Sequence, residues 1–567
     1  MTPRLPGRAV TGWARVTGLL AAALVVVAVG QNVALVLRDA PLPNYDGHYA
    51  RSVNFSTWLA TLDPTFLERH GEPVFFDHAG DPTRYPLYGA YPPVVYLVTA
   101  AVYALGGVSV AHARLAVVLF GLLLLPAAWT IGRALGGRVG GLATLALAAC
   151  APVALHTSRM YVLDYPQAAV TAAAVAAALR SDGFRHRGWS LAAGAALALA
   201  LLTKWSTVYY VTVPLLAVAV ALPGRDRRAW ATWGVGAGLV AWVGLAGVAM
   251  NALCRTPDRW IGAHHWVLAV LLGVIAPAAL AVARVSTLER PTERAVRVGN
   301  FVLAGALALS LAGPWYVWAL GDLRANLQVN AAHFATLGVP ALVGLGTGYL
   351  AHVVLGGAVL LPLGLAAAVR ARDATSLLFA ANLVAVLALL LHTGDARNFL
   401  AVDIQSRLSA ALAVFAAPLA GAWLGRMGRP GAVVTAGLFA ASLAFVTGWI
   451  HSPGATARAA PFWGAHAAVF VDPPAQRPDS WEVAAPDALL TLLAANDRPD
   501  RRWEHVYVVA SRTLRPELNV DDLYVRALLR ADRIVAFDRL SPGVDQLRYE
   551  PMFRAQQARL ATLDWVL

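Results

Sequence analysis

Charged residues are scarce in this chain: Asp, Glu, Lys and Arg make up 14% of its 567 residues, against about 25% in soluble domains. Hydrophobic residues make up 58%, and the mean hydropathy is +0.58. This composition excludes a soluble globular protein and predicts one that crosses a membrane many times. The formal net charge of +13 does not indicate a nucleic-acid surface, because the cations stand between apolar runs and form no tract.

Lysine and cysteine are almost absent. Of the 45 cationic residues only Lys204 is a lysine, and the other 44 are arginines. Cys150 and Cys254 lie in or at the end of apolar runs, so neither a disulfide framework nor a zinc site is indicated. The abundance of Arg, Ala and Gly is typical of a GC-rich bacterial genome, and we therefore expect a bacterial inner (plasma) membrane protein.

Long apolar runs predict about 13 membrane-spanning helices of 17–25 residues or slightly fewer. The first run is too long for a signal-peptide core and lacks a clear cleavage site, so we expect it to be retained as a helix. The predicted spans lie near 15–38, 115–132, 139–157, 166–180, 189–203, 205–222, 230–250, 266–284, 298–318, 345–368, 376–392, 408–425 and 431–450. The run at 93–107 is short and is bounded by Pro92-Pro93 and Gly106-Gly107.

Arginine distribution predicts which side each loop occupies. If 93–107 lies flat at the interface, the loops on the N-terminal side hold 19 arginines, whereas the short loops on the opposite side hold seven cationic residues. If 93–107 crossed, that bias would reverse. Since cytoplasmic loops are rich in Lys and Arg, we predict a cytoplasmic N-terminus, an interfacial helix at 93–107 and an extracytoplasmic C-terminus.

The expected fold is an all-α polytopic membrane protein with a small soluble domain. Residues 1–450 form the transmembrane domain, with a large first outer loop at about 39–114 that carries interfacial helices. Residues 451–567 are richer in Pro and charged residues and form an extracytoplasmic α/β domain. Its expected elements are a strand at Trp503–Ala510, a helix at Asn519–Leu529 and a strand at Arg533–Phe537.

The first outer loop opens with Asn-Tyr-Asp-Gly-His-Tyr-Ala-Arg-Ser at 44–52. Asp46 stands where the first span reaches water, among side chains that donate hydrogen bonds or bind anions: Tyr45, His48, Tyr49 and Arg51. One interpretation is structural, with Asp46 as a helix cap and the tyrosines as interface anchors. The other is a reaction site, favoured by polar residues that the predicted topology brings to the same side.

Those further residues come from separate outer loops. They are Tyr91, which lies later in the first outer loop, and Arg159, Asp164, Lys204, Trp315, Tyr316, His333 and Arg397 from the other outer loops. Each also has a structural interpretation. Arg159 and Arg397 are candidate interfacial arginines whose heads reach water, and Trp315 and Tyr316 are candidate belt aromatics. Lys204 is unusual, because a compact ammonium in a tight hairpin at membrane depth suits a point contact with phosphate.

Carboxylates, cations and aromatics held at one depth suit a lipid-linked phosphosugar, whose phosphate lies among the lipid headgroups. Displacing the phosphate requires cations at the leaving group and a carboxylate that takes the proton of the acceptor hydroxyl.

The same residues resemble a known family, the multispanning GT-C-type glycosyltransferases that use polyprenyl-phosphate sugars. The chain is most similar to the protein O-mannosyltransferase and lipid A aminoarabinose transferase branch, over about 40–320. The similarity lies in the Tyr-Asp-Gly-His-Tyr-Ala opening, Tyr91-Pro92-Pro93, Tyr161-Val162-Leu163-Asp164, Leu201-Leu202-Thr203-Lys204 and Pro314-Trp315-Tyr316. Two features depart from it: Gly47 follows Asp46 where the family often has Glu, and Ala90-Tyr91-Pro92 replaces Glu-Lys-Pro.

The resemblance implies an inverting transfer of a sugar from a polyprenyl phosphate to a glycan, lipid or protein acceptor. It makes Asp46 the catalytic base and Asp164 the second-loop acid, which orients the acceptor or holds a divalent cation. Lys204, Arg159, Arg397, His48 and Arg51 would bind the donor phosphate. Tyr45, Tyr49, Tyr91, Trp315, Tyr316 and His333 would line the substrate pocket. The expected partners are the donor, membrane lipids and an acceptor; a metal ligand set stays open. A transporter or lipid flippase is the alternative function.

The topology is testable with a reporter that is active only outside the cytoplasm. Fused after Leu567 it should be active, and fused at Gly136 it should be inactive. Activity at Gly136 would mean that 93–107 crosses the membrane and that Asp46 has been grouped with the wrong loops.

Overall fold

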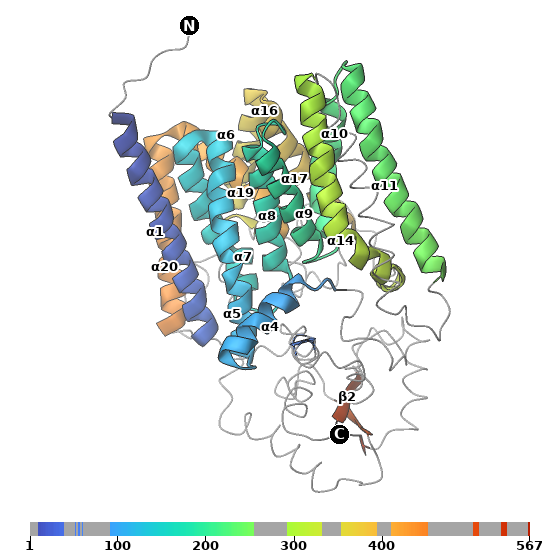
Figure 1. Ribbon diagram of the computed structural model, residues 1–567. Coiled ribbons are helices and arrows are strands. Elements are labelled where there is room, and N and C mark those ends of the chain that lie inside the picture. Colours follow the sequence, from blue (N-terminus) through green and yellow to red (C-terminus); the bar gives the residue numbers. More distant parts are fainter. Residues whose placement is uncertain are drawn as a thin grey trace.

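The computed structural model describes residues 9–38, 52, 55, 56, 59, 91–253, 292–331, 353–393, 410–451, 503–509, 534–540 and 565–566. The helices are α1 (Ala9–Arg38), α4 (Val94–Gly106), α5 (Val110–Leu119), α6 (Gly121–Ala149), α7 (Pro152–Ser158), α8 (Asp164–Arg180), α9 (Arg187–Leu201), α10 (Thr207–Ala221), α11 (Arg227–Leu253), α14 (Glu293–Ala331), α16 (Gly357–Ala371), α17 (Ala374–Thr393), α19 (Ala413–Met427) and α20 (Arg429–His451), with a 3₁₀ turn η2 (Ala410–Leu412). They stand side by side as a bundle (Figure 1).

The bundle is that of a multi-pass membrane protein. Among the described residues, five helices are long and apolar enough to cross a membrane, and several apolar helices are shorter. The total of about 13 spans stays a prediction, because the run at 266–284 lies outside the described residues. Two bounds differ from expectation. Helix α16 begins only at Gly357, after Gly356 in the left-handed region (φ 71°), and α14 continues to Ala331.

The long helix α6 is in fact a hairpin of two arms. At Gly136 and Gly137 the backbone leaves the helical region, and Gly137 has φ 67°, ψ −163°. A Cβ placed on Gly132 would collide with Thr144 Oγ1, although these residues would be about 18 Å apart along one straight helix. The arms are therefore antiparallel, and the two spans predicted at 115–132 and 139–157 are confirmed as separate helices. The second arm ends earlier than predicted because α7 starts anew at Pro152, a residue suited to a first helical turn.

The centre of the bundle is a close contact between α6 and α19. Glycines make it possible: a Cβ on Gly421 would lie 2.7 Å from the Thr144 backbone nitrogen, and one on Gly425 would lie 2.7 Å from that of Gly140. Helices in lipid associate through such small residues, because the hydrophobic effect does not drive them together there. The α19 residues at this contact are almost all buried.

Helix α4 lies obliquely across one end of the bundle (Figure 1). It starts after Pro93 and ends at Gly107, whose φ of 83° favours glycine. Val95 and Thr99 are fully buried against the protein, whereas Leu105 is 92% exposed. A short apolar helix with one buried and one open apolar side fits the interfacial position that the sequence predicts for 93–107.

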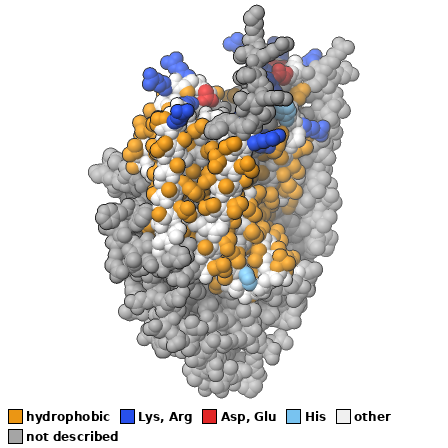
Figure 2. All heavy atoms as spheres, turned by 90° about the vertical axis from the view of Figure 1, so that its left-hand side faces the viewer, with side chains coloured by type: hydrophobic (Ala, Val, Ile, Leu, Met, Phe, Trp, Pro, Cys, Tyr) orange, Lys and Arg blue, Asp and Glu red, His pale blue; other side chains and the backbone are white. Residues whose placement is uncertain are grey.

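Charge and hydrophobicity separate along the bundle. Figure 2 shows Lys and Arg side chains gathered at one end of the described surface, with a broad hydrophobic face beside them. Figure 1 places the start of α1 at one end of the bundle, and α4 and strand β2 toward the other. The predicted topology, with a cytoplasmic N-terminus and an extracytoplasmic C-terminus, stays a prediction.

Ion pairs join the loops at the end opposite α4. Arg185 donates to Asp182 at 2.8 Å and to Glu293 at 2.7 Å, which links the α8–α9 loop to the start of α14. The hydrogen bond from Arg185 holds the pKa of the Asp182 carboxyl below its usual range. These groups are exposed, so we expect each pair to contribute little to stability.

Within the part of the C-terminal region that the structure describes there are three strands: β1 (Trp503–Val509), β2 (Ile534–Leu540) and β3 (Trp565–Val566). They form a parallel sheet in the order β2-β1-β3. Strands therefore occur at both predicted positions. Parallel pairing requires a crossover between β1 and β2. The predicted helix at Asn519–Leu529 falls in that interval, outside the described residues, and the α/β domain stays a prediction.

The α6–α19 contact can be tested by adding side-chain volume. Gly421→Val should destabilise the protein by about 1–3 kcal/mol or more, because the new methyl groups would collide with Thr144. The matched control is Gly437→Val on α20, where no described atom lies within 4 Å of an added Cβ. Thermal unfolding of the detergent-solubilised variants is the measurement. Equal melting temperatures for the two variants would show that the helices are not in close contact.

Candidate functional site

Four of the predicted residues, Asp164, Lys204, Trp315 and Tyr316, lie at the turn between α9 and α10, Leu202–Ser206. The chain reverses there through hydrogen bonds of its own: the Lys204 N–H donates to the Ala200 carbonyl at 3.2 Å, and the Thr207 N–H donates to the Lys204 carbonyl at 3.1 Å. The Thr203 hydroxyl donates to the Leu199 carbonyl at 2.7 Å and completes the end of α9. The predicted back-to-back helical hairpin with Lys204 at its tip is thus present.

Lys204 is ion-paired with Asp164. Its Nζ lies 2.5 Å from Asp164 Oδ1, and the two side chains are 12% and 4% exposed. Asp164 is the first residue of α8, where the helix dipole favours a negative charge. The structure therefore joins two predicted site residues that are 40 positions apart in the sequence.

Helix α8 contacts the same turn a second time, through Gln167. Its side-chain Nε2 donates to Ser206 Oγ at 3.0 Å and to Thr207 Oγ1 at 3.2 Å. Gln167 is 2% exposed and Thr207 is fully buried. Asp164 and Gln167 are three residues apart, so they project from the same face of the helix.

Aromatic residues of α14 contact the turn from another direction. The Tyr316 hydroxyl donates to the Leu201 carbonyl at 3.0 Å. Trp315 is 8% exposed and packs against Leu202 and Trp205. Its indole Nε1 is buried and donates to no residue that the structure describes. These contacts favour the predicted position beside the site over a belt of aromatics that faces lipid.

The start of α4 contacts the α9–α10 turn from a third direction. The Val94 N–H donates to the Leu202 carbonyl at 3.1 Å, and the half-buried Tyr91 precedes it. Further along α4, the hydroxyls of Thr99 and Tyr161 lie 2.9 Å apart and connect the helix to the segment before Asp164. From the first loop, Ser52 Oγ lies 2.7 Å from the Tyr103 hydroxyl.

Arg159 is buried where α7 ends, at 3% exposed. This burial does not fit an arginine whose head reaches water. His156 in α7 is equally buried, and Arg114 in α5 is 1% exposed. Sequence reasoning missed Arg114 and His156. A signal was present for Arg114, because an ionisable residue inside the apolar stretch Val108–Leu125 is unusual and often functional.

Other predicted residues lie outside the described residues. They are Tyr45, Asp46, His48, Tyr49, Arg51, His333 and Arg397. Within the residues that the structure describes, no three His, Cys, Asp or Glu side chains are grouped so that they could hold a metal ion. The question of a divalent cation stays open.

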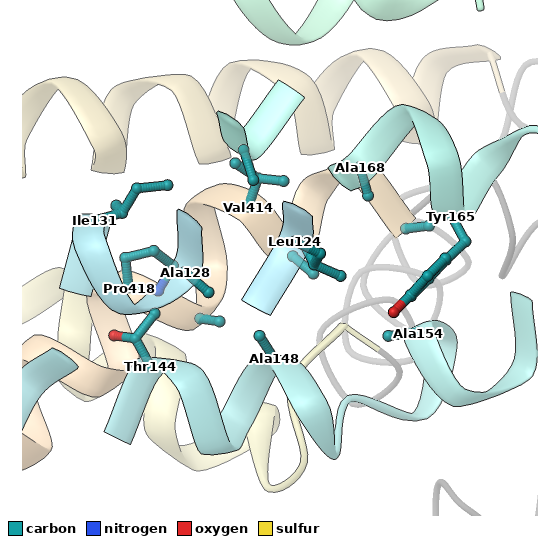
Figure 3. Close-up of a pocket in the computed structure, with 14 residues that line it drawn as sticks. Leu124, Ala128, Ile131, Thr144, Ala148, Ala154, Tyr165, Ala168, Val414 and Pro418 are labelled. Atoms are coloured by element: carbon teal, nitrogen blue, oxygen red, sulfur yellow. The ribbon is translucent and has the colours of Figure 1, made fainter. Parts of the chain in front are cut away.

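A narrow apolar cavity lies beside the site, between α6, α8 and α19 (Figure 3). Figure 3 shows Leu124 and Val414 along it and the Tyr165 hydroxyl at one end, near Ala154. Tyr165 follows Asp164 directly, so one residue contributes to the cavity and its neighbour to the ion pair. Most of the other lining residues are alanines.

A comparison with protein families matches residues 90–251 to the family described as dolichyl-phosphate-mannose-protein mannosyltransferase. The match covers 162 of the 567 residues, and Asp164, Gln167 and Lys204 lie within it. The predicted resemblance to the protein mannosyltransferases is thereby confirmed for this region. No curated protein matches the chain.

Two solved structures of ArnT from Cupriavidus metallidurans are also similar to the chain. The one bound to undecaprenyl phosphate is 17% identical, covers 98% of this chain and 90% of its own, and has a TM-score of 0.36. The apo structure is 17% identical, covers 93% and 90%, and has a TM-score of 0.34.

The Lys204–Asp164 pair can be tested without leaving a buried charge uncompensated. Lys204→Ala alone should cost about 3–5 kcal/mol of stability, because Asp164 would remain buried and charged. The double variant Asp164→Asn/Lys204→Met removes both charges and should fold. If Lys204 contacts a donor phosphate, the double variant should bind a polyprenyl-phosphate sugar about tenfold more weakly, or worse, since charge-assisted contacts contribute about 1.5–3 kcal/mol.

Asp164→Asn alone serves as the control for donor binding, because it keeps both the ammonium and an oxygen that accepts its hydrogen bond. It leaves the nearly buried Lys204 charge without its partner, so we expect it to be less stable than the double variant. Donor binding by this variant should survive. If the double variant folds and binds donor as tightly as wild type, the ion pair has only a structural role.

Proposed function

We propose that this protein is an inverting glycosyltransferase that moves a sugar from a polyprenyl-phosphate donor to an acceptor on the extracytoplasmic face. The acceptor is a glycan, lipid or protein. The observation that carries the proposal is the nearly buried Lys204–Asp164 pair, at a turn bounded by α4, α8 and α14. The family match over 90–251 supports a transferase that uses a lipid-linked sugar.

Lys204 can bind phosphate without leaving Asp164. An ammonium has three N–H donors, and one of them serves Asp164 Oδ1. The remaining donors are available to the oxygens of a phosphate at the same depth. Asp164 thus orients the ammonium, and the positive charge stabilises the negative charge that develops on the leaving group.

Other buried cations near this end of the bundle add to the positive charge. Arg159 and Arg114 are 3% and 1% exposed, and arginine matches phosphate geometry well. We assign Arg159 to the donor phosphate together with Lys204, and we keep Arg397, His48 and Arg51 as further contacts. The indole N–H of Trp315 and the ring of Tyr91 contribute to the substrate pocket, with Tyr316 holding the turn behind them.

The reaction is a single displacement at the anomeric carbon of the sugar. The acceptor oxygen forms a bond to that carbon while the bond from the carbon to the phosphate oxygen breaks, and the configuration inverts. The proton of the acceptor hydroxyl passes to the Asp46 carboxylate. The electron pair of the broken bond stays on the polyprenyl phosphate, which leaves with its charge paired to Lys204.

The base assignment is tested by Asp46→Asn, which keeps a helix-capping side chain but removes the basic carboxylate. Turnover of a polyprenyl-phosphate sugar by purified protein should fall by about 10²–10⁴, the usual contribution of positioned acid–base catalysis. Donor binding should be retained. Asp63→Asn, in the same loop, is the matched control and should be nearly silent.

The assay should measure release of polyprenyl phosphate and sugar transfer together. Near-normal turnover by a well-folded Asp46→Asn protein would leave Asp46 as a cap, as in the structural interpretation. Movement of intact donor across a bilayer with no release of phosphate would instead identify a flippase.

A further inference from the structure

The position of Lys204 is set by a turn, and helical hydrogen bonds do not fix that turn completely. Its long side chain is flexible, so the place of the ammonium depends on where the backbone at 204 is held. That backbone is anchored at the Ala200 carbonyl, which accepts from the Lys204 N–H at 3.2 Å. The same carbonyl also accepts from the Thr207 hydroxyl at 2.9 Å.

Gln167 is connected to the Ala200 carbonyl through the Thr207 hydroxyl. Its Nε2 donates to Thr207 Oγ1, and Thr207 in turn donates to the Ala200 carbonyl. The second Gln167 contact, with Ser206 Oγ at 3.0 Å, holds the other end of the turn. Both contacts cross from α8, the helix whose first residue is Asp164.

We infer that Gln167 is a positioning residue, which fixes the turn so that the Lys204 ammonium rests on Asp164 and meets the donor phosphate at a defined place. The statement that Lys204 meets a phosphate rests on the proposed function. The contact between Gln167 and the turn does not depend on it. The ion pair of Asp164 and the two hydrogen bonds of Gln167 together restrain the turn against sliding along α8 and against rotation about the ion pair. Val94 and Tyr316 hold the turn only before Lys204, at Leu202 and Leu201, so without Gln167 the residues after Lys204 would lose these two hydrogen bonds to α8.

A merely structural role makes a different prediction. If Gln167 only satisfies buried hydroxyls, its loss lowers the stability of the whole protein and leaves Lys204 as it was in the folded fraction. If it positions the turn, its loss changes the environment of Lys204 in protein that remains folded. The two roles are therefore separated by a measurement on Lys204 itself.

The chain offers such a measurement, because Lys204 is its only lysine. Acylation of the folded protein by an amine-reactive reagent, followed by mass spectrometry of the peptide that contains Lys204, reports the accessibility of this one ammonium. Gln167→Met keeps the length of the side chain and removes both hydrogen bonds. We expect Lys204 in this variant to react several-fold faster than in wild type.

Thr171→Val is the matched control on the same helix. Thr171 is fully buried, one turn beyond Gln167, and its hydroxyl has no hydrogen-bond partner among the described residues. The substitution therefore also removes a buried polar group from α8, but no contact with the turn. Lys204 should react at the wild-type rate in this variant.

Kinetics with a polyprenyl-phosphate sugar give the second measurement. Gln167→Met should raise the donor KM about five- to tenfold, the effect of losing one or two neutral hydrogen bonds, with kcat changed less than KM. Gln167→Glu, whose carboxylate can accept from the Ser206 hydroxyl but not from the Thr207 hydroxyl, which donates to the Ala200 carbonyl, should recover only part of the loss. Ser206→Ala removes only one contact, so it should give a smaller change in the same direction, and it replaces Gln167→Met if that variant does not fold.

The outcomes separate the two proposals. Wild-type acylation of Lys204 in a folded Gln167→Met or Ser206→Ala protein overturns the inference, as does an equal change in Thr171→Val. If Lys204 is acylated faster in Gln167→Met but the wild-type protein transfers no sugar, the inference about Gln167 is supported. Only the proposed function is then contradicted.

Discussion

The ion pair between Lys204 and Asp164 is the interaction on which the arrangement of the site depends. Removing two charges from water is costly, and their attraction compensates only when the geometry is good and other groups complete the hydrogen bonding. The protein meets this condition by holding the lysine turn from several sides. Val94 binds the Leu202 carbonyl, Tyr316 binds the Leu201 carbonyl, and Gln167 binds the two hydroxyls that follow Lys204. The pair thus joins elements that are far apart in the sequence.

The helical framework must be rigid for such a pair to stay in place. At its centre the framework packs through close backbone approach between α6 and α19. The arms of α6 fold back at Gly136-Gly137 and pack against α19. A Cβ at Gly421 or Gly425 of α19 would collide with the backbone of α6. Because the hydrophobic effect provides no driving force between helices in lipid, this packing has to supply the attraction. Helix α8, which carries Asp164 and Gln167, is buried along most of its length.

The site combines a polar end with an apolar side. Asp164 faces Lys204, whereas the next residue, Tyr165, lines the narrow cavity between α6, α8 and α19 (Figure 3). Buried cations at Arg114 and Arg159 lie on neighbouring elements, α5 and the end of α7. A reaction that releases a phosphate needs positive charge of this kind, held in a region from which water is largely excluded. The proposed donor, with its phosphate and its polyprenyl chain, has a charged and an apolar part of the same kind.

The sequence by itself determined the class of protein and the location of most helices. Each spanning helix must satisfy its own backbone hydrogen bonds within the membrane, so a local apolar run is enough to predict it, and helices are found at 9–38, 187–201, 207–221 and 429–451. Lys204 was identified because it is the single lysine of the chain. Asp164, Trp315 and Tyr316 were identified because their motifs resemble those of a known family. Only the tertiary structure decided that Lys204 and Asp164 contact one another, that Gln167 binds the turn, and that Arg114 and Arg159 are buried. Those features depend on side chains that meet across tens of residues, and hydropathy carries no information about which faces of two helices come together.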